Sequence, residues 1–159
     1  MIERVHSSVD LQAAAGRFGQ AQHVLVVATK SPGFTDLTAE LRRWLQSIRA
    51  DDGVLTAFVR HTSASLVIQE NADADVQHDL ADTLDRLAPQ STRYRHAIEG
   101  PDDMPAHIKA MLTATSLSIP VSGGAPVFGT WQALYLVEHR TAPHRREVVL
   151  HFMGTLRRA

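Results

Sequence analysis

The sequence predicts an α+β fold: a single compact domain with a largely antiparallel β-sheet and two to three helices. A length of 159 residues suits one domain, and no internal repeat, low-complexity tract or linker divides residues 1–159. Runs of strand length that are rich in β-branched and aromatic residues outnumber the helical patterns. Their order lacks the regular strand–helix alternation of a parallel sheet, which favours the α+β class.

The first third of the chain is expected to contain two strands and a helix. Residues 2–9 are the weaker strand candidate, and the β-branched run 23–29 is typical of a buried strand. After a Ser-Pro-Gly turn, Thr35 or Asp36 is expected to cap a helix that residues 51–53 end. The apolar stripe of this helix comprises Leu37, Leu41, Trp44, Leu45 and Ile48.

The middle of the chain is expected to hold two strands and two helices. The strands cover residues 54–60 and 65–69, and a helix follows over about residues 72–87, before Pro89. The buried face of that helix is expected to comprise Val76, Leu80, Leu84 and Leu87. A third, shorter helix begins near Pro105, because proline is favoured at the first helical position.

The last third is expected to form strands. Residues 116–121 are the first of them, and the Ser-Gly-Gly-Ala-Pro run 122–126 is a hairpin turn. Residues 130–140 and 146–154 are the final two strands, joined by residues 141–145.

Composition narrows the function classes. The formal net charge of −1 provides no basic field, so nucleic acid is not an expected partner. The absence of cysteine excludes disulfides, thiolate metal sites and a cysteine nucleophile. No apolar run approaches the ~20 residues of a membrane span, and the charged first ten residues do not resemble a signal peptide. We therefore expect a cytoplasmic protein that binds neither nucleic acid nor membrane.

Nine histidines are the compositional outlier, and three of them stand in places of interest. His61 ends a strand and precedes small and hydroxyl side chains, which fits a capped strand end and, as the alternative, a ligand site. His96 and His107 bracket an acidic Gly-Pro loop, with His107 in the first turn of a helix. These two imidazoles with a third would form a nitrogen-rich divalent metal site with open positions. Spacing alone leaves a packing role as the alternative.

Charged residues lie at the ends of expected strands. Glu70 and Asn71 stand where a strand passes into a helix, and such junctions commonly line sites. Glu138 ends an apolar strand, and four alternative roles are open for it. It is a metal ligand, a hydrogen-bond partner of a metal ligand, a general base, or an exposed carboxylate paired with a nearby arginine. An arginine cluster follows, formed by Arg140, Arg145 and Arg146. These side chains are expected either to bind phosphate oxygens or to be solvated at the tip of a hairpin. Ser63 or Ser65 together with a histidine would suggest a serine hydrolase, but the sequence has no G-x-S-x-G elbow and no recognisable triad order, so we discount this class.

Four stretches, in order along most of the chain, resemble the YjbQ-like family, also described as secondary thiamine-phosphate synthases. They are HTSASLVIQENADADVQHD, YRHAIEGPDDMPAHIKA, SLSIPV and GTWQALYLVEHR. The run SPGFTDLT ahead of the first helix matches as well, so the resemblance covers roughly residues 31–154. Many relatives carry Phe-Asp-Gly-Pro-Arg after the glutamate. This chain has His-Arg-Thr-Ala-Pro-His-Arg-Arg at that place, which resembles a second branch of the family.

The resemblance implies a homotrimer with sites near the subunit boundaries. It implies that one divalent metal, zinc or magnesium, is bound by His61, His96 and His107. The residues expected to be catalytic are Glu138, Glu70 and Lys109. Those expected to bind substrate or phosphate are Ser63, Asn71, Gln132, Arg140, Arg145 and Arg146. The family pattern also carries Asp79.

The implied reaction joins hydroxymethylpyrimidine pyrophosphate to a thiazole phosphate and releases pyrophosphate, as a weak or secondary activity. Such chemistry requires a cation and arginines on the leaving pyrophosphate. Two alternatives stay open. One is a metal-dependent hydrolase of a small phosphorylated or ester substrate, in which Glu138 takes a proton from water. The other is a non-catalytic metabolite-binding trimer.

Overall fold

The structure is a computed structural model that describes residues 2–10 and 18–157, with side chains from residue 18 onward. The elements along the chain are β1 (Ile2–Asp10), β2 (Phe18–Thr29), β3 (Gly33–Asp36), α1 (Thr38–Ser47), β4 (Ala50–Val59), β5 (Ala64–Glu70), α2 (Ala74–Leu87), α3 (Asp103–Leu112), β6 (Ser116–Ser122), β7 (Ala125–Pro126), β8 (Gln132–Glu138) and β9 (His144–Leu156). All the strand pairs are antiparallel, so the predicted α+β class in one compact domain is confirmed.

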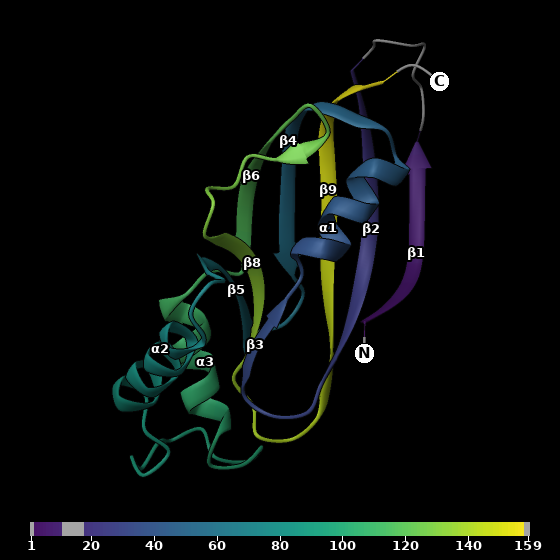
Figure 1. Cartoon of the computed structure of the whole chain (residues 1–159). Coiled ribbons are helices and arrows are strands. Elements are labelled where there is room, and N and C mark those ends of the chain that lie inside the picture. The colour runs from purple at the N-terminus through teal and green to yellow at the C-terminus, as the bar shows by residue number, and fades with distance from the viewer. Residues whose placement is uncertain (1, 11–17, 158–159) are drawn as a thin grey trace.

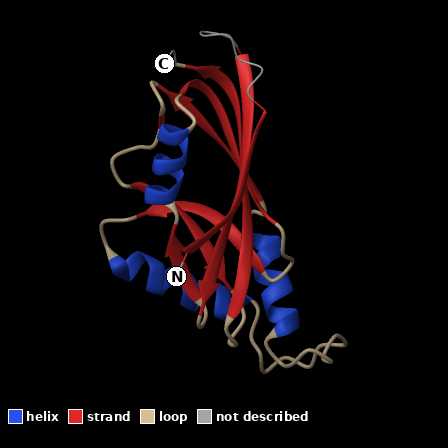
Figure 2. Cartoon of the chain, turned by 90° about the vertical axis from the view of Figure 1, so that its right-hand side faces the viewer, coloured by secondary structure: helices blue, strands red, loops and turns tan. Residues whose placement is uncertain are grey.

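The strands form two sheets rather than one. The larger has the order β1-β2-β9-β4-β6-β7, and the smaller has the order β3-β8-β5. In both views α1 lies beside the upper half of the large sheet (Figures 1 and 2), and α2 and α3 lie at the lower end of the molecule, near the small sheet (Figure 1). The long strands of the large sheet twist across the molecule from one end to the other (Figure 2).

The hydrophobic core fills the space between α1 and the two sheets. Its largest fully buried side chains come from each of these layers and include Leu41, Leu45, Leu55, Leu134, Leu136 and Phe152. The apolar stripe predicted for α1 is confirmed, because Leu37, Leu41 and Leu45 are completely buried. Asp36 accepts a hydrogen bond from the Thr38 backbone N–H (2.7 Å) just before the helix.

Residues 51–53 do not end the first helix, contrary to the prediction. The helix ends at Ser47, and Arg49 turns the chain with a positive φ of 55°. The Asp-Asp-Gly run then lies in β4, at an irregularity of its pairing with β9. Gly53 is needed there because a Cβ would lie 2.3 Å from the Met153 carbonyl oxygen. The glycine therefore serves a close approach of two strands.

The last two strands are close in the sequence, which had indicated that they pair. In the structure they are not neighbours. Strand β8 is the centre of the small sheet, between β3 and β5, whereas β9 lies between β2 and β4 in the large sheet. Both edges of each strand are occupied by other partners, so the connection after Glu138 crosses from one sheet to the other. Every residue of β8 after Gln132 is buried, because both faces of the strand are covered.

Two helices differ from their predictions. No residue of α2 is fully buried, and Leu87 of the expected buried face is 62% exposed. Helix α3 begins at Asp103, two residues before Pro105, and this shift brings an aspartate into its first turn. None of the helices within the described ranges is long and apolar enough to cross a membrane.

Candidate functional site

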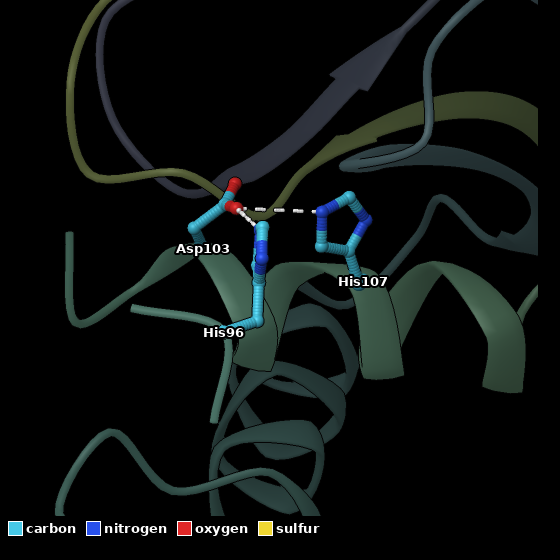
Figure 3. Close-up of side chains that lie close together, drawn as sticks. All are labelled: His96, Asp103 and His107. Carbon is cyan, nitrogen blue, oxygen red and sulfur yellow. Dashed lines mark hydrogen bonds and ion pairs between the residues drawn. The ribbon is translucent and has the colours of Figure 1, made fainter. Parts of the chain in front are cut away.

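His96, Asp103 and His107 converge at the start of α3 (Figure 3). His96 Nε2 lies 2.7 Å from Asp103 Oδ2, and His107 Nε2 lies 3.4 Å from the same oxygen. One ligand atom from each residue lies within 4.8 Å of the others. The predicted proximity of His96 and His107 is therefore present in the structure, with their ring centroids 5.5 Å apart.

Local structure explains why these three side chains meet. Asp103 and His107 are four residues apart in α3, so they lie one above the other on the same helix face. His96 comes from the preceding loop. Gly100, with a φ of 111°, provides a turn in that loop which other residues rarely adopt. The loop thus returns His96 to the beginning of the helix.

The tautomer of His107 is set by its contact with another segment. His107 Nδ1 lies 3.0 Å from the Thr62 carbonyl oxygen and donates to it, because a carbonyl can only accept. The lone pair of neutral His107 is then on Nε2, the atom that faces Asp103. A second hydrogen bond of this kind is the usual support of a metal-binding histidine.

Arg140 holds the second oxygen of Asp103. Its guanidinium is paired with Asp103 Oδ1 and donates from Nε to Asp102 Oδ2 at 3.1 Å and from Nη2 to the Glu99 carbonyl at 2.7 Å. The Asp103 side chain is only 2% exposed, and its other oxygen, Oδ2, lies toward the two imidazoles, 2.7 Å from His96 Nε2 and 3.4 Å from His107 Nε2. Arg140 is therefore engaged within the chain, and the predicted contact with phosphate has less support.

Asp102 connects the same loop to the end of β8. Burial alone would raise the pKa of Asp102, but hydrogen bonds from the Thr141 backbone and hydroxyl and from Arg140 lower it to about 2. The carboxylate is thus ionised at neutral pH. Together, Asp102 and Arg140 attach the loop that carries His96 to the connection between the two sheets.

The donor set fits a transition metal. Two imidazole nitrogens and one carboxylate oxygen suit zinc or another first-row divalent ion better than magnesium, which prefers oxygen ligands. Three protein ligands leave coordination positions for water or substrate. The His96 side chain is 44% exposed and that of His107 is 33% exposed, so solvent reaches the site from this side.

His61 is not part of this cluster, contrary to the predicted set of three imidazoles. Among the described side chains (residues 18–157), the group that could share an ion contains Asp103 as its third member. His61 Nε2 instead accepts a hydrogen bond from the Glu147 backbone N–H at 2.9 Å. Burial lowers the pKa of His61, and nearby Arg146 lowers it further. The four-residue spacing of Asp103 and His107 along α3 was the signal that could have identified the third member of this cluster.

Glu138 and Arg146 form a buried ion pair between the two sheets. Arg146 donates from Nε to Glu138 Oε2 (2.7 Å) and from Nη2 to Oε1 (2.6 Å). Burial raises the pKa of Glu138, but hydrogen bonds from Arg146 and Thr29 outweigh it and lower the pKa. Glu138 is 2% and Arg146 is 3% exposed. The predicted roles as general base and phosphate ligand are therefore not supported by this geometry.

The other predicted residues lie in several places. Lys109 is buried and paired with Asp85 of α2, and Arg145 is exposed on β9. Ser63 is buried beside the end of β4. Asp79 is exposed on α2.

Glu70, Asn71 and Gln132 lie at the opposite end of the small sheet from Glu138. Glu70 pairs with Gln132 across β5 and β8, whereas Glu138 pairs with Ala64. Six residues of strand separate these ends, or roughly 20 Å. Within one chain the structure therefore divides the predicted catalytic and substrate-binding residues between two locations.

Ser65, one of the two serines that the sequence analysis considered together with a histidine, forms a buried pair with His139. Ser65 Oγ is 2.8 Å from His139 Nε2, and both residues are buried. Burial, followed by the nearby charge of Lys109, lowers the pKa of His139 to about 4. The neutral imidazole accepts the Ser65 hydroxyl proton, so the pair is a structural contact between β5 and the residue that follows β8.

The fold and the site define a class: a single-domain α+β protein with two antiparallel sheets and a candidate centre of two histidines and one aspartate. A sequence model described as "UPF0047 protein YjbQ-like" matches residues 22–155. The chain belongs to this YjbQ-like (UPF0047) family. It is 48% identical over 143 residues to UPF0047 protein sll1880 of Synechocystis, covering 89% of this chain and 97% of the relative.

Solved structures agree with this membership. A YjbQ/UPF0047 family protein of Clostridium acetobutylicum is 33% identical, with a TM-score of 0.73 over 80% of this chain and 98% of its own. A YbjQ-like protein of Sulfolobus solfataricus has a TM-score of 0.80 at 21% identity, covering 87% of this chain and 99% of its own. The second comparison bears on the fold alone, and it extends the shared architecture to distant sequences.

Proposed function

We propose that this protein is a metal-dependent enzyme that acts on a small phosphorylated molecule. The observation that carries the proposal is the convergence of His96, Asp103 and His107, with one ligand atom from each lying within 4.8 Å of the others. Zinc is the expected ion, because the donor set is rich in imidazole nitrogen. A bound divalent ion would supply a Lewis acid for a phosphate oxygen.

The residues of the chain prepare this site in separate ways. The Thr62 carbonyl keeps the proton of His107 on Nδ1, so that Nε2 remains a ligand. Arg140 keeps Asp103 oriented through Oδ1. His96, the most exposed of the three, donates its Nε2 proton to Asp103 Oδ2, and it would give up that proton to serve as a ligand through Nε2. The buried Glu138–Arg146 pair fixes the end of β8, and Glu138 also accepts a hydrogen bond from the backbone N–H of Arg140.

The test of the ion site is elemental analysis of zinc-equilibrated protein. We expect about one zinc per chain in the wild type and background levels in His96→Ala and His107→Ala, with unchanged circular dichroism. His78→Ala is a matched control, because His78 is an exposed histidine on α2 whose neighbour in space is Asp75. Full zinc occupancy in both site variants would show that the site lies elsewhere.

We further propose thiamine-phosphate synthesis as the reaction, in a homotrimer. Family membership and the resemblance of the site-bearing stretches support this finer assignment. Pyrophosphate release from hydroxymethylpyrimidine pyrophosphate should depend on the thiazole phosphate and should fall to background in Asp103→Asn, because the amide weakens both the Arg140 pair and the ligand. A colorimetric pyrophosphate assay with and without the acceptor measures this.

Two alternatives give different results in the same assay. Release that ignores the thiazole phosphate would favour a metal-dependent hydrolase, although Glu138 is then not its base, since Arg146 occupies both carboxylate oxygens. Binding of substrate without turnover at any zinc loading would favour a metabolite-binding trimer.

A further inference from the structure

A hollow of about 580 Å³ adjoins the candidate metal site. It is lined by residues 58–63, at the end of β4, and by Thr115. Thr62 connects the two places, because it lines the hollow while its carbonyl accepts the Nδ1 proton of His107. One residue of the lining is thus in direct contact with a candidate metal ligand, although the three candidate ligands do not themselves line the hollow.

His61, which lines this hollow, is arranged as a hydrogen-bond donor. Its Nε2 accepts from the Glu147 backbone N–H at 2.9 Å, so the proton of the neutral ring is on Nδ1. Within the described residues no hydrogen bond of Nδ1 is observed, which leaves this N–H for a ligand. In this arrangement neither nitrogen of His61 offers a lone pair to a metal.

The remaining lining is rich in donors and contains no acidic residue. Thr62, Ser63 and Thr115 contribute hydroxyl groups, and Arg60 contributes a guanidinium whose side chain is 57% exposed. Glu147, the nearest partner of Arg60, is already paired with it at 2.9 Å. Hydroxyl, imidazole and guanidinium donors together suit the oxygens of a phosphate group.

An aromatic wall completes the hollow. Phe58 is 44% exposed although it is a large apolar side chain on a strand. An exposed aromatic face next to polar donors is typical of sites that take a ligand with one apolar part and a few polar groups. The hollow therefore suits the phosphate monoester of a small organic molecule.

We propose that His61 binds the phosphate of the substrate in this hollow through Nδ1–H, and that it is not a metal ligand. The proposal rests on the proposed function in one respect: the phosphate is taken to belong to the substrate that reacts at the nearby ion site. It names the substrate group and the residue that recognises it.

The test measures the binding of inorganic phosphate to metal-free full-length protein by isothermal titration calorimetry. We expect His61→Ala to weaken binding by about tenfold, the usual cost of losing one hydrogen bond to a charged group. His61→Gln should keep most of the affinity, because its amide can both accept from Glu147 and donate to phosphate. Thr62→Val, at an exposed position that keeps the carbonyl, should weaken binding by a smaller factor.

Controls separate this inference from the ion site. His151→Ala, on β9 with Gln20 as its partner, should leave phosphate affinity unchanged. Zinc content of His61→Ala should equal that of the wild type. Loss of zinc in His61→Ala, or equal phosphate affinity in the wild type and in His61→Ala and Thr62→Val, overturns the inference. If the wild type binds no zinc but its phosphate binding still depends on His61, the ion site is overturned and the inference about His61 stands.

Discussion

The Arg146→Met protein is expected to lose about 3–5 kcal/mol of its free energy of unfolding, because the change leaves the Glu138 carboxylate buried without its counter-ion. Both oxygens of Glu138 accept hydrogen bonds from Arg146, and the carboxylate is 2% exposed. The pair also joins β8 of the small sheet to β9 of the large sheet. Urea denaturation followed by circular dichroism measures the loss.

Two further variants test whether the unpaired Glu138 carboxylate causes the loss of stability. Arg145→Met, at the exposed neighbouring position on β9, should change stability by about 0.5 kcal/mol or less. Arg146→Met combined with Glu138→Gln should recover part of the loss, because the neutral amide costs less to bury than a carboxylate. An equal loss at Arg145, or a double variant no more stable than Arg146→Met, would contradict this account.

The second large effect is a loss of stability on mild acidification through His139. Its pKa in the folded protein is about 4, lowered from 6.5 by burial and by Lys109, while Glu138 and Asp85 act in the opposite direction. Between these two values the unfolded chain takes up a proton that the folded chain does not. Stability should therefore fall as the pH decreases from about 6.5 to about 4, by an amount on the order of 3 kcal/mol.

The measurement compares urea midpoints at pH 7 and pH 4.5 for the wild type and His139→Gln. The glutamine does not titrate, and its amide oxygen can accept the Ser65 hydroxyl proton that His139 Nε2 accepts. We expect a smaller pH dependence in the variant, since His61 and the carboxylates titrate in both proteins. Parallel pH profiles for the two proteins would show that His139 does not titrate in this way.

Much of the fold was predictable because it depends on local pattern. The β-branched run 23–29 lies in β2, and the 3.6-residue spacing of Leu37, Leu41 and Leu45 identified the buried stripe of α1. The lack of strand–helix alternation indicated antiparallel pairing, which all the described ladders show. The loop between His96 and His107 allowed them to meet, but only the family resemblance predicted that they share a site.

The division into two sheets was not predictable in the same way. Residues 132–138 and 144–156 have strand patterns, but a pattern does not state which edges pair. The buried face expected for α2 failed for a related reason, since burial depends on whether another element covers the stripe. Both features depend on contacts between segments that are distant in the chain.

The sequence by itself determined the α+β class, most of the strands and helices, the family, and two of the three candidate ligands. Only the tertiary structure decided that Asp103 lies with His96 and His107, that His61 turns its Nε2 toward Glu147, and that Arg146 neutralises a buried Glu138. The physical reason is that helix and strand periodicity act over a few residues. The state of an imidazole or a carboxylate is set by the hydrogen bonds and charges that folding brings to it from elsewhere in the chain.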